Sequence, residues 1–466
     1  MSSVCASKRI STGIAALSLL ALAACESSSP LTSAPANASL GKGVPAPAPA
    51  APPSQYVVLF NDGATDFANP AASGVQLGKL QNLAGAVYGY VADPAALRAD
   101  PNVKAVLENT LSYTSDAYPT GALYFQRGWQ WNMQQIRADQ VPSSVQGLGT
   151  RACIIDTGID ETHQDLAGKV VASTSFVDQA HGYPGPGLSP SALDSAGHGT
   201  HVAGTVTTNG IGVAGVAPAA KLMSAKVFAA TGGGSLAAIF DAMAWCTANN
   251  ADVISMSLGG KRTKPFDASS MADRDAYIAL VDAARSAGTV VVAAAGNDNV
   301  SLDPSAPYEY WPAQIPGVIT VGASAATANP YFNFPFPSPA PSAVFDNKAG
   351  YSQFGPDIDI WAPGGTGFIN RPEAGITSTC SSFRLGGGCA GGKYYWSIQG
   401  TSMATPHVSG GVVLVTSRSS LPRGLARTQA VEACLLSSGD PVTLSGTPTR
   451  PRLNALKAAT DACSGL

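Results

Sequence analysis

The segment Arg151–Gly158 reads RACIIDTG, a short apolar run that ends in an aspartate, a threonine and a glycine. Similar β-branched runs recur at Lys221–Val227, Asp252–Met256, Thr289–Ala294 and Gly317–Val321. Because these runs are continuous rather than alternating, both faces of each strand should be covered, as in a parallel sheet. The aspartate comes directly after a strand end, where parallel sheets carry their ligands.

Helical patterns lie between the strand patterns, at Gly199–Thr208, Leu236–Asn249, Ala272–Ala287 and Thr405–Ser417. Alternating strands and helices predict an α/β fold, with a doubly wound, mostly parallel sheet and helices on both faces. Residues 325–348 carry several prolines and aromatics, which predict a long surface loop to which we assign no role.

The composition indicates a globular protein and argues against two classes of partner. The chain has 466 residues, of which 45% are hydrophobic and 12% are charged, and it carries a net charge of -3. Without an excess of basic residues, nucleic acid is not expected as a partner. Beyond the N-terminus no apolar run reaches the roughly 20 residues that a membrane-spanning helix needs.

The N-terminus has the pattern of a targeting segment. Lys8 and Arg9 precede the apolar run Ile10–Leu22, which is short for a membrane span. We therefore interpret residues 1–24 as a signal peptide. The sequence Leu-Ala-Ala-Cys ending at Cys25 resembles the bacterial lipoprotein cleavage box, in which the cysteine becomes lipidated; a plain secretory signal is the alternative. Both interpretations predict export.

Two further segments precede the first core strand. Residues 25–54 are rich in Ala, Pro and Ser and should form an extended tether, because they offer almost nothing to bury. Residues 55–115 predict a small α+β block, with strands at Tyr56–Phe60 and Gly85–Val91 and a helix start at Asp93–Leu97.

Three distant motifs present an aspartate, a histidine and a serine in that order. They are ACIIDTG at 152–158, GHGTHVAG at 197–204 and GTSMATP at 400–406. A serine hydroxyl becomes nucleophilic when a base takes its proton, and a carboxylate holds the base in the right tautomer. The order separates this arrangement from the other common triad orders.

These motifs resemble the subtilisin family of serine endopeptidases, which hydrolyse peptide bonds. The resemblance implies that Ser402 attacks the carbonyl, His198 relays the proton and Asp156 orients the imidazole. It also places Asn297 and the backbone N–H of Ser402 at the oxyanion. Residues 55–115 are similar to the family propeptide, which assists folding of the peptidase and inhibits it. Residues 116–466 then form the peptidase domain.

Each of these residues also has a structural interpretation. Asp156 and Asn297 could simply be turn formers at strand ends, and Ser402 a helix cap, with Pro406 in the first helical turn. His198 and His201 could be half of a zinc site, although a third ligand with recognisable spacing is lacking. A metallohydrolase and a non-catalytic cell-envelope binding protein on a protease scaffold are therefore the alternatives.

The resemblance also implies where the substrate backbone pairs. The two matching segments contribute Gly232, Gly233 and Gly234, and Ser257, Leu258 and Gly259. Backbone pairing holds an extended peptide with little demand on its side chains. Bulky residues at Tyr308–Pro312, near the family's primary specificity pocket, argue against a broad apolar preference.

No metal site and no organic cofactor are predicted. Asp165 matches an acidic ligand of the family's strong calcium site, but the loop Asn209–Val213 is shorter than in bacterial subtilisins. Calcium requires about six or more oxygen ligands. A structural calcium ion therefore stays open but is not expected at this loop.

The chain has eight cysteines, of which Cys5 lies in the signal and Cys25 is the lipidation candidate. The oxidising compartment permits disulfides among the remaining ones. We predict bridges between Cys380 and Cys389 and between Cys434 and Cys463. Cys153 and Cys246 fall on a buried strand and helix, where we expect plain thiols.

The order of the segments implies a life history. Self-cleavage between Leu111 and Phe125 would separate the peptidase from its anchor, because the lipidation site lies upstream of the propeptide. We expect a lipid-anchored precursor in the cell envelope and a monomeric enzyme that is periplasmic or extracellular after processing. Its partners would be protein or peptide substrates and its own propeptide as inhibitor, with the membrane contacted only through the lipidated precursor.

Overall fold

The computed structural model describes residues 55–60, 77–79, 86–90, 98–108, 118–177, 193–229, 233–326, 346–366, 375–384, 394–444 and 446–460. The predicted signal peptide, the tether with Cys25, the helix start Asp93–Leu97 and most of the 325–348 loop lie outside these residues. Among the described residues, no helix is long and apolar enough to span a membrane.

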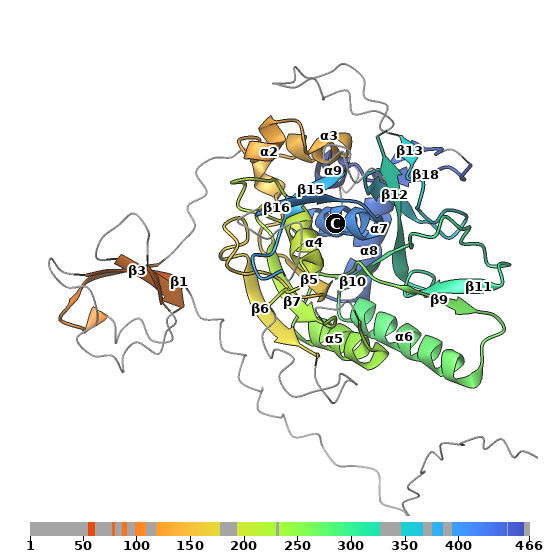
Figure 1. Cartoon of the computed structure of the whole chain (residues 1–466), viewed down its shortest axis with the longest axis horizontal. Helices are drawn as coiled ribbons and strands as arrows, with labels where there is room; N and C mark the ends of the chain where they lie inside the picture. The colour runs from red at the N-terminus through yellow and green to blue at the C-terminus, as the bar shows by residue number, and fades with distance from the viewer. Residues whose placement is uncertain are drawn as a thin grey trace, which may run out of the picture. The chain divides into compact units, whose positions relative to one another are not determined.

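A ten-stranded sheet forms the centre of the peptidase region (Figure 1). In spatial order it contains β17 (Asp440–Val442), β18 (Arg450–Arg452), β14 (Ile360–Pro363), β12 (Val318–Ala325), β10 (Val290–Ala294), β8 (Val253–Met256), β5 (Arg151–Asp156), β7 (Lys221–Lys226) and β6 (Val170–Ser175), with β13 (Asn347–Lys348) beside β12. The pairs from β6 to β18 are parallel, and β17 and β13 pair antiparallel. The predicted parallel sheet is confirmed.

Helices cover both faces of the sheet, as predicted. Those near the predicted ranges are α4 (His198–Val206), α5 (Leu236–Ala248), α6 (Ala268–Ser286) and α7 (Thr401–Thr416), to which α8 (Leu425–Ser437) and α9 (Ala455–Thr460) are added. Alternate residues of β5 enter two separate cores. Ala152 and Ile154 pack with α4 and α7, whereas Cys153 and Ile155 pack with α5 and α6.

Smaller elements surround this core. They are α2 (Leu123–Gln126), α3 (Trp131–Gln135), the 3-10 turns η2 (Ala138–Gln140) and η3 (Ser143–Val145), and the antiparallel pairs β9 (Gly260–Thr263) with β11 (Tyr308–Trp311) and β15 (Ile376–Thr379) with β16 (Tyr395–Ile398). Both pairs matter for the site, because β9 and β11 line a cavity and β15 packs against α4.

The N-terminal block contains an antiparallel sheet of four strands in the order β2 (Leu77–Lys79), β3 (Ala86–Tyr90), β1 (Gln55–Phe60) and β4 (Val103–Glu108). Strands β1 and β3 agree with the predicted strands at Tyr56–Phe60 and Gly85–Val91. The role of residues 55–115 as a propeptide stays a prediction.

The expectation of free thiols at Cys153 and Cys246 is wrong, because the two residues form a disulfide. Strand β5 and helix α5 pack against each other, which brings the two α-carbons to 5.9 Å across 93 residues of sequence. Cys380 and Cys434 are also disulfide-bonded, and their predicted partners Cys389 and Cys463 lie outside the described residues.

Replacing both Cys153 and Cys246 by alanine should lower the free energy of unfolding by about 2–5 kcal/mol, because a long loop in the unfolded chain is no longer closed. Denaturant unfolding of the chain with and without the two alanines, both in a Ser402→Ala background, measures this change. A loss below about 1 kcal/mol would contradict the structural importance of the bridge.

Candidate active site

Asp156 is the last residue of β5 and is almost completely buried. Its Oδ1 accepts a hydrogen bond from the backbone N–H of Thr157 at 2.7 Å. Both carboxylate oxygens face Nδ1 of His198, at 2.8 and 2.9 Å. Because a carboxylate only accepts, Nδ1 of His198 carries the proton in this pair, and Nε2 is left to act on another group.

His198 begins helix α4, and two glycines bring it to Asp156. Gly197 caps the helix with φ of 88°, in the left-handed region that favours glycine. A Cβ on Gly199 would lie 2.2 Å from the carbonyl oxygen of Gly158, so only glycine allows the helix to approach the aspartate loop this closely.

The environment of His198 favours its protonated form. Burial lowers the pKa of His198, but the charge and hydrogen bond of Asp156, with the charge of Asp194, raise it more, so that the net pKa lies above its usual value. A third of the side chain stays exposed, at 33%, against 1% for Asp156. The imidazole is therefore reachable from solvent, while its carboxylate partner is not.

Asp194 is a further residue of the site that our sequence analysis missed. It is completely buried, and its Oδ1 accepts from the Thr157 hydroxyl at 2.8 Å and from the Gly197 N–H at 2.7 Å. Its Oδ2 accepts from the Thr200 N–H at 2.8 Å. The one available signal was its place four residues before His198, which by itself resembles an ordinary turn aspartate.

Ser402 lies inside the first turn of α7 rather than before the helix, and the predicted cap is wrong. Helix α7 begins at Thr401, its N-cap is Gly400 without a side-chain cap, and Pro406 lies inside the helix. A proline has no N–H, so it leaves the carbonyl oxygen of Ser402 without its helical donor. The Ser257 hydroxyl supplies the missing hydrogen bond, at 2.7 Å.

The hydroxyl of Ser402 donates to the carbonyl oxygen of Ser257 at 3.2 Å. In the described part of the chain, no hydrogen bond joins this hydroxyl to His198. The structure therefore joins Asp156 and His198 by direct hydrogen bonds, whereas Ser402 is brought toward His198 through the packing of helix α7 against α4. Such loose contacts are common in unliganded active sites.

Asn297 follows β10, and its orientation is fixed by Thr401. Its Oδ1 accepts from the backbone N–H of Thr401 at 2.9 Å and from the Thr401 hydroxyl at 3.0 Å. Since a backbone N–H can only donate, the amide oxygen must face Thr401. The Nδ2 group is thereby left on the other side as a donor.

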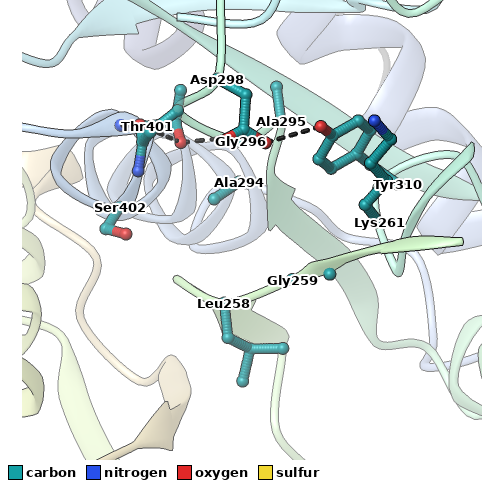
Figure 2. A pocket seen from close by; sticks show the side chains of 12 residues that line it. Leu258, Gly259, Lys261, Ala294, Ala295, Gly296, Asp298, Tyr310, Thr401 and Ser402 are labelled. Atoms are coloured by element: carbon teal, nitrogen blue, oxygen red, sulfur yellow. Dashed lines mark hydrogen bonds between the residues drawn. The ribbon is translucent and has the colours of Figure 1, made fainter. Parts of the chain in front are cut away.

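A cavity of about 320 Å³ opens beside Ser402 and Asn297 (Figure 2). It is lined by Leu258, Gly259, Gly260, Lys261, Ala294, Ala295, Gly296, Asn297, Asp298, Tyr310, Thr401 and Ser402. Of the bulky stretch at 308–312, Tyr310 reaches the cavity, and its hydroxyl donates to Asp298 at 2.6 Å. Leu258 and Gly259, two of the predicted substrate-binding residues, line the cavity, whereas Ser257 is not among its lining residues, and their role stays a prediction.

The other predicted substrate segment is described only in part. Gly232 lies outside the described residues. Gly234 forms an isolated antiparallel bridge with Phe228, and the Gly233 carbonyl accepts from Ala229 N–H at 3.1 Å. A Cβ on Gly233 would meet nothing within 4 Å, so this residue borders open space.

His201 and His407 have structural partners. Nε2 of His201 faces the carbonyl oxygens of Ile376 and Trp396, and burial lowers the pKa of His201 to about 3. Burial likewise lowers the pKa of His407, on α7, to about 4. Across the described residues, no group of three or more His, Cys, Asp or Glu could hold a metal ion.

The carboxylate of Asp165 is occupied by protein donors. It accepts from the backbone N–H groups of Ile211, Gly212 and Val213 at 2.7, 2.9 and 3.2 Å, and from the Tyr395 hydroxyl at 2.8 Å. The short loop at 209–213 therefore turns its N–H groups, rather than oxygen ligands, toward the aspartate.

Comparison with known proteins agrees with the geometry. The sequence matches the subtilase family, Peptidase S8, over residues 147–445. Subtilisin NAT from Bacillus subtilis subsp. natto is 33% identical over 69% of this chain and 67% of its own length, and thermitase from Thermoactinomyces vulgaris 31% over 71% and 95%. A solved protease structure from Pseudoalteromonas arctica, 28% identical, superposes with a TM-score of 0.57 over 75% of this chain and all of its own.

The fold and the site together define a serine peptidase of α/β architecture. The chain belongs to the subtilase family.

Asp165→Asn should lower the free energy of unfolding by about 1.5–3 kcal/mol, because charge-assisted hydrogen bonds to the 209–213 loop are lost. The solvent-exposed pair made by Asp303 and Ser305 offers a control, and Asp303→Asn should change stability by less than about 1 kcal/mol. Thermal unfolding with added calcium tests whether protein donors alone occupy this carboxylate. If calcium raised the melting temperature of the wild type but not of Asp165→Asn, the carboxylate would bind a cation and this explanation would be wrong.

Proposed function

We propose that this chain is an exported endopeptidase, made as a precursor that cleaves itself, in which Asp156, His198 and Ser402 act as a catalytic triad. The observation that carries the proposal is the contact of both Asp156 oxygens with Nδ1 of His198, at 2.8 and 2.9 Å. This contact fixes the tautomer in which Nε2 is a base.

In the proposed reaction, the Ser402 hydroxyl turns from the Ser257 carbonyl to Nε2 of His198 and attacks the peptide carbonyl. The proton moves from Ser402 to Nε2, and the bond between carbonyl carbon and serine oxygen forms. The imidazolium, stabilised by Asp156, then protonates the leaving amine as the peptide bond breaks. Water attacks the acyl-enzyme by the same steps and restores Ser402.

Asn297 is the proposed side-chain donor to the oxyanion, together with the backbone N–H of Ser402. The hydrogen bonds from Thr401 support this role, because they hold the Asn297 oxygen and leave Nδ2 free to donate. A donor that is oriented before the reaction stabilises the developing charge without reorganising.

An extended substrate would pair its backbone with Ser257, Leu258 and Gly259 on one side and with Gly232–Gly234 on the other. The cavity lined by Leu258 and Gly259 supports this placement, since it begins beside Ser402 and would receive the side chain next to the cleaved bond. Tyr310 and Asp298 then bound the end of that cavity.

We also propose that residues 55–115 are a propeptide and inhibitor, and that Cys25 anchors the precursor through a lipid. The contacts of Tyr118 and Tyr124 support a cleavage site in the first part of the expected range from Leu111 to Phe125. Tyr118 is buried, and its hydroxyl donates to Gly215 O at 2.9 Å. Tyr124 N–H donates to Gly212 O at 2.8 Å. Cleavage that spares these contacts falls between Leu111 and Tyr118.

Ser402→Ala should abolish peptide hydrolysis and leave the precursor uncleaved, because no nucleophile remains.

In the wild type, kcat/KM should fall as pH drops through the pKa of His198, which lies above the usual value near 6.5, since only the neutral imidazole accepts the serine proton. Peptide assays across pH measure this. Retained activity in Ser402→Ala, or inhibition by chelators instead of serine-directed reagents, would refute the proposal.

Processing should yield a mature N-terminus between Leu111 and Tyr118 and release active enzyme from the membrane fraction. N-terminal sequencing of the mature protein and cell fractionation test this, with Ser402→Ala as the control that stays lipidated and membrane-bound. Active, processed enzyme that still carries the lipid would contradict the proposed order of events.

A further inference from the structure

Four ionisable groups gather where β5, β7 and the start of α4 meet. Asp156 ends β5, Lys226 ends β7, and Asp194 and His198 flank the N-cap of α4. Asp156, Asp194 and Lys226 are all buried. The proposed mechanism assigns a role to Asp156 and His198 but gives none to Asp194 or Lys226.

Asp194 connects the two loops that carry Asp156 and His198. The hydroxyl of Thr157, next to Asp156, donates to Asp194 Oδ1 at 2.8 Å and accepts from the Gly199 N–H at 2.8 Å. The same carboxylate accepts from the N–H groups of Ala196, Gly197 and Thr200, at 3.1, 2.7 and 2.8 Å. Its oxygens thus hold both the aspartate loop and the helix start.

Lys226 is the fourth member of the cluster. Its ammonium donates to the carbonyl oxygen of Thr157. Burial lowers the pKa of Lys226 more than the charges of Asp194 and Asp156 raise it, so that the net pKa lies below its usual value. Through Thr157 the lysine is joined to the same loop as both carboxylates, and it is the buried cation of this cluster.

The charges of this cluster do not cancel while His198 is neutral. Two carboxylates and one ammonium leave the buried cluster with a net charge of one negative unit, which the hydrogen bonds to the carboxylates solvate but do not neutralise. Protonation of His198 supplies the missing positive charge. The protonated state is the one that forms when the imidazole has taken the serine proton.

We propose that Asp194 is a positioning residue for His198, and that Asp194, Asp156 and Lys226 form a buried cluster whose charge is balanced when the imidazole becomes protonated. This inference rests on the proposed function of His198 as the base. A cluster that is balanced only in that state stabilises the transition state more than the resting state, which is what raises kcat.

Other charged groups beside His198 do not replace this cluster. His201, one turn along α4, is neutral because burial lowers its pKa to about 3. The side chain of Arg384 lies against Gly197, but its guanidinium is stacked 3.8 Å from the centre of the Trp396 ring. Asp194 and Lys226 are the buried charges of this cluster that can be removed without changing Asp156 or His198.

The test compares Asp194→Asn with Lys226→Met in the purified mature enzyme. Asp194→Asn should shift the acid limb of kcat/KM by about half to one pH unit downward, because a negative charge that favours the imidazolium is lost. Lys226→Met should shift the same limb upward. Asp194→Asn should also lower kcat about tenfold or more, with a smaller effect on KM.

Asp160→Asn is a matched control. Asp160 is equally buried, and its carboxylate also accepts four hydrogen bonds, from the N–H and hydroxyl groups of Thr162 and Ser382. Among the described residues, no hydrogen bond joins the Asp160 carboxylate to Thr157, Gly197 or Thr200, the residues that Asp194 holds. Its loss should therefore reduce stability but leave the acid limb in place.

Opposite shifts for Asp194→Asn and Lys226→Met, with none for Asp160→Asn, support the proposal. Lower kcat without a shift, or equal shifts in Asp194→Asn and Asp160→Asn, would overturn it. If Asp194→Asn fails to fold, an unchanged acid limb in Lys226→Met is sufficient to overturn it. Peptide hydrolysis that remains in Ser402→Ala would instead refute the proposed function, so the two failures are distinguishable.

Discussion

The structure depends on keeping the carboxylate of Asp156 charged although it is 1% exposed. A buried charge needs partners, and here they are the Thr157 N–H and the His198 ring. The parallel sheet positions this carboxylate, because β5 ends at Asp156 and packs against α4, which begins at His198. Close approach of α4 then requires glycine at 199, where a Cβ would collide with the Gly158 carbonyl.

The segment that carries Ser402 is held by a hydrogen bond from outside its own helix. Pro406 removes the hydrogen bond that would normally reach the Ser402 carbonyl, and Ser257 at the end of β8 takes it over. The two serines exchange hydrogen bonds, since the Ser402 hydroxyl donates to the Ser257 carbonyl. The proline inside α7 thus connects the proposed nucleophile to the segment after β8 that continues into the cavity-lining residues Leu258 and Gly259.

The sequence predicted five strands of the central sheet, four of the helices that cover it and the motif residues, because these are encoded in local patterns. It did not predict what depends on packing. The Cys153–Cys246 bridge requires that β5 and α5 meet across 93 residues, which no spacing rule reveals. The early start of α7 at Thr401 was missed because its N-cap is a glycine rather than a capping side chain. Asp194 was missed because its partners are chiefly backbone N–H groups, which every residue type provides.

Asp165 and Asp194 present the same solution with different consequences. Both are buried carboxylates that accept mainly from backbone N–H groups of a neighbouring loop. Asp165 closes a loop and lies beside Tyr395, whose pKa burial raises. Burial lowers the pKa of His163 and of Lys169, which the charge of Asp165 partly offsets, but neither group takes part in the proposed reaction. Asp194 lies near His198, whose charge changes during the proposed reaction, and its own fixed charge therefore acts on that step. What distinguishes a structural aspartate from a functional one here is the group that titrates beside it, not its hydrogen bonds.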